Sequence, residues 1–424
     1  MPSATAPLTS TQTIALTTSA GVADAVRAAH DARQPVYPLG GRTALNYGIA
    51  PAREGVGLDL TGLAKIVDYT PRDMTIVVEA GVRMADLAAT LAVEGQQLPI
   101  DVPRAAEATI GGVVATNWNG SRRYGYGTIR DYVIGIHAVD GRGVLFKGGG
   151  RVVKNVAGYD FCKLLTGSLG TLAVITRLAL KLKPLPERSV TVSATCRDLA
   201  GAEQAMARLT KLPAPPAAID LLFGTDWPIA SPIWSTKSAA SPSNKGPFVV
   251  VRAEGTELET AWLADQIVRE LAQSGAIAPF KIEQAEADAL WNKHIEFADR
   301  GASDSGDGSP MVVKIAVPPS GVTQVIAELI SFDSGCRITA HAGNGIILAR
   351  FSRFSHADVG RVLLGKLRPA ALQQGGRLVV LKTSLEGLTP HVVWGGRTDA
   401  TVLMERIKQK FDPHNILNPN RFAF

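Results

Sequence analysis

The chain has 424 residues, of which 46% are apolar and 19% charged, so it can form more than one packed core and is not a disordered chain. It contains no run of 18 apolar residues, and a transmembrane helix is therefore not expected. The 44 Lys and Arg residues outnumber the 38 acidic residues, but they are dispersed along the chain, so nucleic acid is not an expected partner.

Hydrophobic periodicity predicts alternating strands and helices in the first part of the chain. Helices are expected at 20–34 and 83–95, and strands at 35–41, 57–60, 63–69, 75–80, 132–139, 145–147 and 172–182. The last of these strands ends before Pro184 and Pro186, which cannot continue a strand interior. We place a domain boundary at these prolines.

The second part mixes strands and helices in a different order. Strands are expected at 189–196, 218–222, 247–255, 311–317 and 337–350, and helices at 199–212, 259–275 and 357–374. This order indicates a split sheet with packed helices. Trp291, His294 and Phe297 recur at helical spacing, which favours packing within this domain. Residues 403–422 predict a helix that stops at Pro413, followed by an extended segment.

Three glycine-rich segments are the most specific local signals. In residues 38–48 a strand runs into Gly40-Gly41, where backbone N–H groups can converge on an anion such as a pyrophosphate. Residues 109–140 space small residues too densely for an ordinary amphipathic helix, which lets a flat ring system approach the backbone. Residues 148–176 place a short helix before a tight glycine turn. Each segment alone is compatible with an ordinary turn, whereas the three together indicate one ligand-binding domain.

In their order and spacing, these segments resemble the FAD-binding domain of the vanillyl-alcohol oxidase / p-cresol methylhydroxylase (PCMH) flavoprotein family. Residues 155–176 and 410–422 are most similar to the FAD-binding subunits of bacterial glycolate oxidases within that family. The resemblance implies an α+β fold with a two-subdomain FAD-binding domain of the PCMH type at 1–187. It further implies an α+β cap domain with a split antiparallel sheet at 188–400, and a C-terminal segment, 401–424, that returns to the FAD-binding domain.

The resemblance also implies which residues contact FAD. It places the pyrophosphate on main-chain amides after residue 39, the flavin and ribityl chain along 103–120, the adenine side on the strand near 130, and a last contact after Gly170. The implied residues are Leu39, Gly40, Gly41, Arg42, Thr43, Pro103, Thr109, Gly111, Gly112, Thr116, Asn117, Gly120, Arg130, Asp131, Val133, Gly170, Thr171, Val174 and Ile175. Because no histidine lies where relatives attach the flavin covalently, we expect non-covalent FAD.

The second domain carries an altered form of a signature of hydroxyacid-oxidising relatives. Residues 341–348 read His-Ala-Gly-Asn-Gly-Ile-Ile-Leu, where the signature is His-x-Gly-Asp-Gly-Asn-x-His and its histidines bind a divalent metal. Leu348 replaces the second histidine and Asn344 the aspartate, which leaves His341 without a carboxylate partner in this motif, so no metal site is expected. The catalytic candidates are His341 as general base and Arg350 as the ligand of the substrate carboxylate.

We therefore expect an FAD-dependent oxidoreductase that serves as the FAD-binding subunit of a glycolate oxidase complex and carries electrons from a small anionic 2-hydroxy acid. Its expected partners are a flavin-containing catalytic subunit and an iron–sulfur subunit, because three scattered cysteines cannot hold a cluster in this chain. The alternatives are a self-sufficient FAD-dependent dehydrogenase of D-lactate or another 2-hydroxy acid, and a non-catalytic flavin-binding scaffold. The first 21 residues show no secretion signal, so a cytoplasmic location is expected, with any contact to the inner membrane made through partner subunits.

Overall fold

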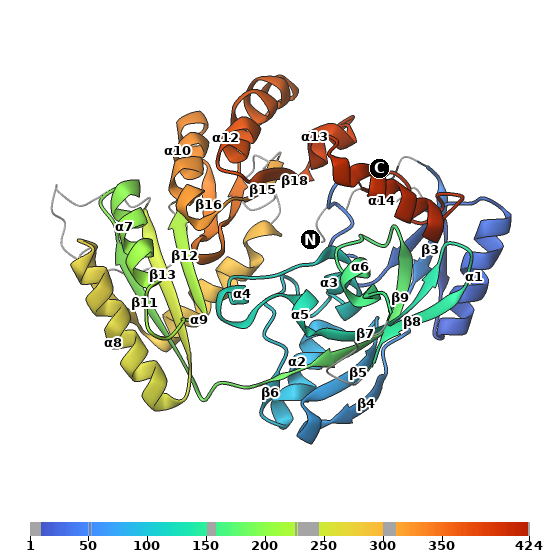
Figure 1. Cartoon of the computed structure of the whole chain (residues 1–424), viewed down its shortest axis with the longest axis horizontal. Helices are drawn as coiled ribbons and strands as arrows, with labels where there is room; N and C mark the ends of the chain where they lie inside the picture. Colours follow the sequence, from blue (N-terminus) through green and yellow to red (C-terminus); the bar gives the residue numbers. More distant parts are fainter. Residues whose placement is uncertain are drawn as a thin grey trace. The chain divides into compact units, whose positions relative to one another are not determined.

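The computed structural model describes residues 10–49, 51, 53–150, 158–224, 227, 246–299 and 311–422. Residues 151–157 of the third glycine-rich segment therefore lie outside the described part of the chain. The chain divides into two compact units (Figure 1). The first unit consists of residues 1–119, 128–185 and 388–424, and the second of residues 120–127 and 186–387.

This division differs from the expected boundaries at two short segments. Residues 120–127 interrupt the first unit and belong to the second, where the Gly125 amide donates a hydrogen bond to the Ala217 carbonyl at 3.1 Å. Residues 388–400 belong to the first unit, where the ring of Trp394 packs on that of Phe422 with centroids 5.1 Å apart. For both segments, tertiary contacts rather than position in the sequence decide which unit they belong to.

The first unit contains a small parallel sheet with its own core. Strands β1 (Ser10–Ala15), β2 (Val36–Leu39) and β3 (Gly55–Asp59) pair in the order β1-β3-β2. Helix α1 (Ser19–Asp31) buries Val22, Val26 and Ala29, which are spaced as the sequence predicts, and Thr18 caps it by accepting a 3.0 Å bond from the Gly21 amide. Ile416 of the C-terminal segment joins this core.

A second, antiparallel sheet completes the first unit. Strands β4 (Ile66–Thr70), β5 (Thr75–Glu79), β7 (Val133–Asp140), β8 (Leu145–Gly149) and β9 (Ala173–Lys181) pair in the order β4-β5-β9-β7-β8. Helices α2 (Met84–Val93) and α3 (Ile110–Thr116) contribute buried side chains to its core. The density of small residues at 109–120 argued against an amphipathic helix, yet a seven-residue helix forms there and buries Ile110, Val113 and Val114.

Short elements connect these sheets and end the chain. They are β6 (Gln96–Gln97), β10 (Lys183–Pro184), α5 (Ile129–Tyr132), α6 (Phe161–Leu165), α13 (Pro390–Trp394) and α14 (Asp399–Phe411). After α14 the chain turns at Asp412-Pro413, as the sequence predicts. The extended segment predicted beyond it is wrong, because among the described residues after Pro413 only Leu417 forms a bridge, to Val36, and Asn415, Asn418 and Asn420 take positive φ.

The second unit is built on one eight-stranded antiparallel sheet. Its strands are β11 (Arg188–Thr195), β12 (Ala218–Phe223), β13 (Phe248–Gly255), β14 (Ile277–Ile282), β15 (Met311–Ala316), β16 (Arg337–His341), β17 (Ile346–Arg350) and β18 (Arg377–Thr383). They pair in the order β14-β11-β13-β12-β16-β17-β15-β18, with every pair antiparallel. The α+β fold class expected from the sequence is therefore confirmed.

Helices pack against this sheet and bury its centre. They are α4 (Arg123–Tyr126), α7 (Leu199–Leu209), α8 (Glu257–Gln273), α9 (Gln284–Ile295), α10 (Val322–Phe332), α11 (His356–Asp358) and α12 (Arg368–Gln373). Every residue of β12 is buried, so the sheet is covered on both faces there. Figure 1 shows α7 and α8 beside β11 to β13, and α9 shares a core cluster with β12 and β13.

Two expected elements of the second unit differ in detail. The single strand predicted at 337–350 is a hairpin, because Gly345 takes a positive φ of 71° and reverses the chain between β16 and β17. The helix predicted at 357–374 is interrupted by a π-helical segment, Val359–Leu367, that leads into α12. Among the described residues, no helix is long and apolar enough to span a membrane.

Candidate cofactor site

A large cavity lies within the first unit. Four stretches separated in sequence supply most of its wall: residues 37–47, 102–118, 169–175 and 418–421. Its free volume, open mouth included, is about 1240 Å³. Stretches from distant parts of the sequence thus converge on one concave surface, as in a site built for a single ligand.

Glycines bring bare backbone to the cavity wall. A Cβ atom on Gly40 would lie 2.2 Å from Thr109 Oγ1, and one on Gly41 would lie 1.7 Å from the Glu107 carbonyl oxygen. Only glycine therefore lets the loop after β2 rest on the segment that enters α3. Gly112 is different, because it is exposed and its nearest neighbour would be Thr109 Oγ1 at 3.4 Å. A backbone surface of this kind leaves room for phosphate groups and a planar ring, so the residues present fit FAD.

The C-terminal segment closes one side of the cavity. The Arg421 guanidinium donates hydrogen bonds to the carbonyl oxygens of Ile49 at 2.9 Å, Ala44 at 3.3 Å and Leu45. Burial lowers the pKa of Arg421 to about 10, and this value is still high enough for the guanidinium to be charged at neutral pH. Asn418 Nδ2 donates to the Leu169 carbonyl at 2.7 Å. One short segment thereby holds both the loop after β2 and the turn before β9.

A buried ion pair fixes this segment in place. Lys408 Nζ lies 2.6 Å from Asp412 Oδ2 and donates to the carbonyls of Thr171 at 2.8 Å and Leu417 at 3.0 Å. Burial lowers the pKa of Lys408, and the neighbouring Asp412 partly offsets that effect. Asp412 also accepts bonds from the amides of Ile416 at 3.0 Å and Leu417 at 2.7 Å. Breaking this network would release the segment that carries Arg421.

Thirteen of the nineteen residues implied by the family resemblance line the cavity. They are Leu39, Gly40, Gly41, Arg42, Thr43, Pro103, Thr109, Gly111, Gly112, Thr116, Gly170, Val174 and Ile175. Residues from distant parts of the sequence thus converge on one surface.

The other six residues do not line the cavity. Asn117 ends α3 in the left-handed conformation, and Gly120 belongs to the second unit. Arg130 is exposed, and Asp131 caps α5 by accepting bonds from the Thr128 amide and hydroxyl, each at 2.7 Å. Val133 is buried in a strand, and Thr171 is buried with its hydroxyl on the Ser168 carbonyl at 2.7 Å. Contact of these six residues with FAD stays a prediction.

Several lining residues were not predicted. Tyr37, Tyr47, Trp118, Asn418 and Arg421 line the cavity, and Trp118 Nε1 donates to the Asp101 carbonyl at 3.1 Å. The similarity of 410–422 to family members was the available signal for Asn418 and Arg421. The aromatic residues carried no periodicity that distinguishes a cavity wall from a core.

The two catalytic candidates lie in the second unit on neighbouring strands. Arg350 pairs with Arg337 and His341 with Ile346, so their backbones are four residues, or about 13 Å, apart. Arg350 is 6% exposed and donates to the Phe297 carbonyl at 3.3 Å. The roles of His341 as general base and of Arg350 as the ligand of the substrate carboxylate stay predictions.

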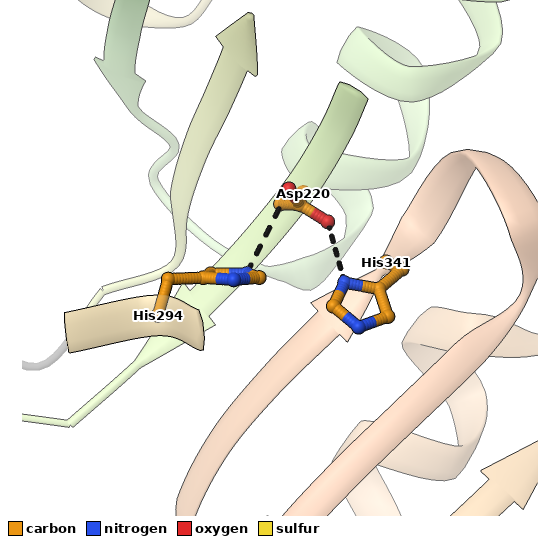
Figure 2. A group of neighbouring side chains, drawn as sticks. All are labelled: Asp220, His294 and His341. Atoms are coloured by element: carbon orange, nitrogen blue, oxygen red, sulfur yellow. Dashed lines mark hydrogen bonds and ion pairs between the residues drawn. The ribbon is translucent and has the colours of Figure 1, made fainter. Parts of the chain in front are cut away.

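The expectation that His341 lacks a carboxylate partner is wrong. Figure 2 shows Asp220 between His341 and His294, with His341 Nδ1 3.1 Å from Asp220 Oδ1 and His294 Nε2 3.7 Å from Asp220 Oδ2. The sequence motif could not reveal this partner, because 121 residues separate Asp220 from His341. His294 and Trp291 are buried, in line with the expected packing role, but His294 also belongs to this polar group. These three side chains form the one group among the described residues with the composition and spacing to hold a metal ion.

The fold and the cavity define the class of protein as a flavin-dinucleotide-binding protein with a second, sheet-based domain. A family model for the FAD binding domain matches residues 11–149, and one for the C-terminal domain of FAD linked oxidases matches residues 185–376 and 397–422. The second match covers more than half of the chain, and the chain belongs to the FAD-linked oxidase family.

Individual relatives agree with this assignment. The chain is 25% identical over 397 residues to glycolate oxidase subunit GlcD of Bacillus subtilis, across 92% of this chain and 84% of that protein. It is 26% identical to the mitochondrial cytochrome-type D-lactate dehydrogenase of Arabidopsis thaliana, across 94% of this chain and 71% of that protein. A solved structure of alkyldihydroxyacetonephosphate synthase shares the fold, with a TM-score of 0.69 and 18% identity over 96% of this chain and 75% of that one. The chain is thus an FAD-linked oxidoreductase of the glycolate oxidase and D-lactate dehydrogenase family, with FAD as its cofactor.

Proposed function

We propose that this chain is the FAD-binding subunit of a complex that oxidises a small anionic 2-hydroxy acid such as glycolate. The observation that carries the proposal is a contrast between the two units. In the first unit, all four segments that form the wall of the cofactor cavity are in place. In the second unit, the hydroxyacid signature lacks its second histidine. Leu348 replaces that histidine, is 5% exposed and lies in β17 between Thr339 and Lys314 of the neighbouring strands. An apolar, buried side chain at this position favours a relay of electrons over substrate oxidation by this chain alone.

The relatives support membership of a complex. One relative is named as glycolate oxidase subunit GlcD, and 139 residues of the chain are 39% identical to glycolate oxidase subunit GlcE of Escherichia coli, across 32% of this chain and 40% of that protein. Conversion of a 2-hydroxy acid to a 2-oxo acid releases two electrons and two protons. Bound FAD supplies an acceptor for that electron pair.

Onward transfer in this proposal requires a partner with its own redox centre. The three cysteines of the chain are all buried, unpaired in disulfides and far apart in sequence, so an iron–sulfur cluster would be held by another subunit. We infer a flavin-containing catalytic subunit and an iron–sulfur subunit as the partners.

Non-covalent attachment of FAD is part of the proposal. Among the described residues that line the cavity, none is a histidine or a cysteine, the residue types that tether flavin in relatives. Acid precipitation of the yellow protein should therefore leave the flavin in the supernatant. Flavin that remains in the pellet would contradict this part of the proposal.

Turnover assays separate this function from its main alternative, a self-sufficient dehydrogenase. The similarity to a D-lactate dehydrogenase over 94% of this chain and 71% of that protein favours this alternative. The purified chain, loaded with FAD, would be assayed with glycolate or D-lactate and a dye acceptor, alone and co-purified with candidate partner subunits. Turnover only in the complex supports the proposal, and robust turnover by the chain alone rejects it. Bleaching of the flavin absorbance under anaerobic conditions, on addition of substrate and partners, distinguishes electron transfer from a scaffold role, in which the flavin would stay oxidised.

A further inference from the structure

The buried cluster in the second unit has no role in the cofactor cavity. Asp220 lies in the middle of β12, His294 near the end of α9, and His341 at the end of β16 (Figure 2). Their side chains are 0%, 3% and 5% exposed. Three titratable groups that come from separate elements and are removed together from water need a chemical reason for their placement.

The spacing of the three side chains suits a shared ligand. The donor atoms all lie within 4.8 Å of one another, and Asp220 is 3.1 Å from one imidazole nitrogen and 3.7 Å from the other. Donors bound to one metal at about 2.0–2.2 Å in a tetrahedron lie roughly 3.4 Å apart. The two distances from Asp220, one from each carboxylate oxygen, bracket this value.

The donor chemistry points to a transition metal. Two imidazole nitrogens and one carboxylate oxygen form a set that binds Zn²⁺ and other divalent first-row metals, whereas Mg²⁺ and Ca²⁺ prefer all-oxygen sets. A divalent cation would also neutralise the carboxylate that is buried between the two rings. Three protein ligands leave a fourth position open for a small ligand.

The surroundings hold these donors in place. The rings of Trp291 and Trp227 lie 5.3 Å and 6.1 Å from the His294 ring between centroids. The Thr339 hydroxyl lies 2.8 Å from His294 Nε2, the nitrogen that faces Asp220, and a bound metal would take the place of this hydrogen bond. The packing of the tryptophan rings limits rotation of the imidazole and keeps it directed toward Asp220. Fixed side chains around the ligands are what a metal site requires for affinity.

We propose that Asp220, His294 and His341 bind one divalent transition-metal ion, for which Zn²⁺ is the probe. Only His341 belongs to the altered signature, so two of the three ligands come from positions outside that motif. The site would replace the lost signature ligands by residues of β12 and α9. This inference rests on the geometry of the second unit, and none of the observations that support it comes from the proposed electron-relay function.

Metal binding to the whole chain tests the proposal directly. The FAD-loaded protein is treated with EDTA, desalted, reloaded with Zn²⁺ and desalted again, and its metal content is measured by elemental analysis. We expect about one Zn²⁺ per chain, and a visible absorption spectrum of low-symmetry coordination when Co²⁺ is used instead. Wild-type protein that retains no metal above the buffer level, even after loading, overturns the proposal.

Variants locate the metal. Asp220→Asn, His294→Gln and His341→Asn keep the approximate size and hydrogen-bonding capacity of the side chains, and each should weaken Zn²⁺ binding by about tenfold or more in competition with a chromogenic chelator. The matched control is His414→Gln, because His414 stacks on His30 at 4.1 Å between centroids and is an alternative imidazole pair.

The outcomes of this comparison are distinct. Loss of binding in the three cluster variants, with binding retained in the control, supports the site. Unchanged binding in the cluster variants, or loss in the control, overturns it. Far-ultraviolet circular dichroism identifies a variant that fails to fold, and the wild-type stoichiometry and Co²⁺ spectrum then still decide the question. None of these measurements uses substrate or an electron acceptor, so failure of the metal site and failure of the proposed function remain distinguishable.

Discussion

Arg421 offers a quantitative test of how the C-terminal segment supports the cofactor cavity. Replacement by Met keeps the apolar stem but removes the guanidinium that bonds to the carbonyls of Ala44, Leu45 and Ile49. A hydrogen bond to a charged group contributes about 1.5–3 kcal/mol. Because water can satisfy the loop carbonyls once the guanidinium is gone, the net loss should be closer to one such bond than to three.

If the loop must then be ordered when FAD binds, this loss appears in the affinity. A deficit of about 1.5–3 kcal/mol corresponds to a dissociation constant for FAD raised about 10- to 150-fold. Flavin fluorescence quenching on titration of the apoprotein measures this constant. The control is Arg406→Met, which removes an exposed guanidinium from α14, a helix of the same unit. An FAD affinity of Arg421→Met within twofold of the wild type, with the control also unchanged, would refute the proposed support of the loop.

Further predictions concern glycines, a buried lysine and the thiols. Gly112→Val should leave the melting temperature unchanged, because the new side chain meets little protein, but it should weaken FAD binding, because Gly112 lines the cavity. Gly111→Ala should lower the melting temperature, because its Cβ would lie 2.7 Å from that of Ala80. Burial, and to a smaller extent Arg123, lowers the pKa of Lys314 to about 8, so the folded chain releases a proton that the unfolded chain keeps up to about pH 10. The buried ammonium therefore lowers the free energy of unfolding at pH 7, and this free energy should rise between pH 8 and 10 as Lys314 loses its proton in the folded chain. In urea unfolding, Lys314→Met should be more stable than the wild type at pH 7 and should not show this rise with pH. Burial raises the pKa of all three thiols, so iodoacetamide at pH 8 should label the unfolded but not the native chain.

Local sequence patterns predicted those parts of the fold that depend on local physics. The apolar stripe of α1, the β-branched run of β5 and the buried strand β9 could be predicted, because periodicity and side-chain type decide them. The Gly40-Gly41 turn was predicted as part of the site, because glycine clusters mark close backbone approach.

The remaining parts depend on contacts between distant residues. Asp220 and His341 meet across 121 positions and Arg421 reaches Ala44 across 377 positions, so no local pattern records either contact. The exposed position of Arg130 and the capping role of Asp131 were also missed, because a charged pair near a strand does not state which way its side chains point. Tertiary packing determines these contacts and side-chain positions.

The return of residues 416–421 to the first unit has a consequence for biosynthesis. During translation, the three wall segments at 37–47, 102–118 and 169–175 leave the ribosome long before the segment at 418–421 is made. The complete cavity can therefore form only after residues 416–421 have been made, and a nascent chain that stops before Arg421 should not retain FAD with full affinity. Cofactor capture in this protein would then report that the chain has been produced at least as far as Arg421.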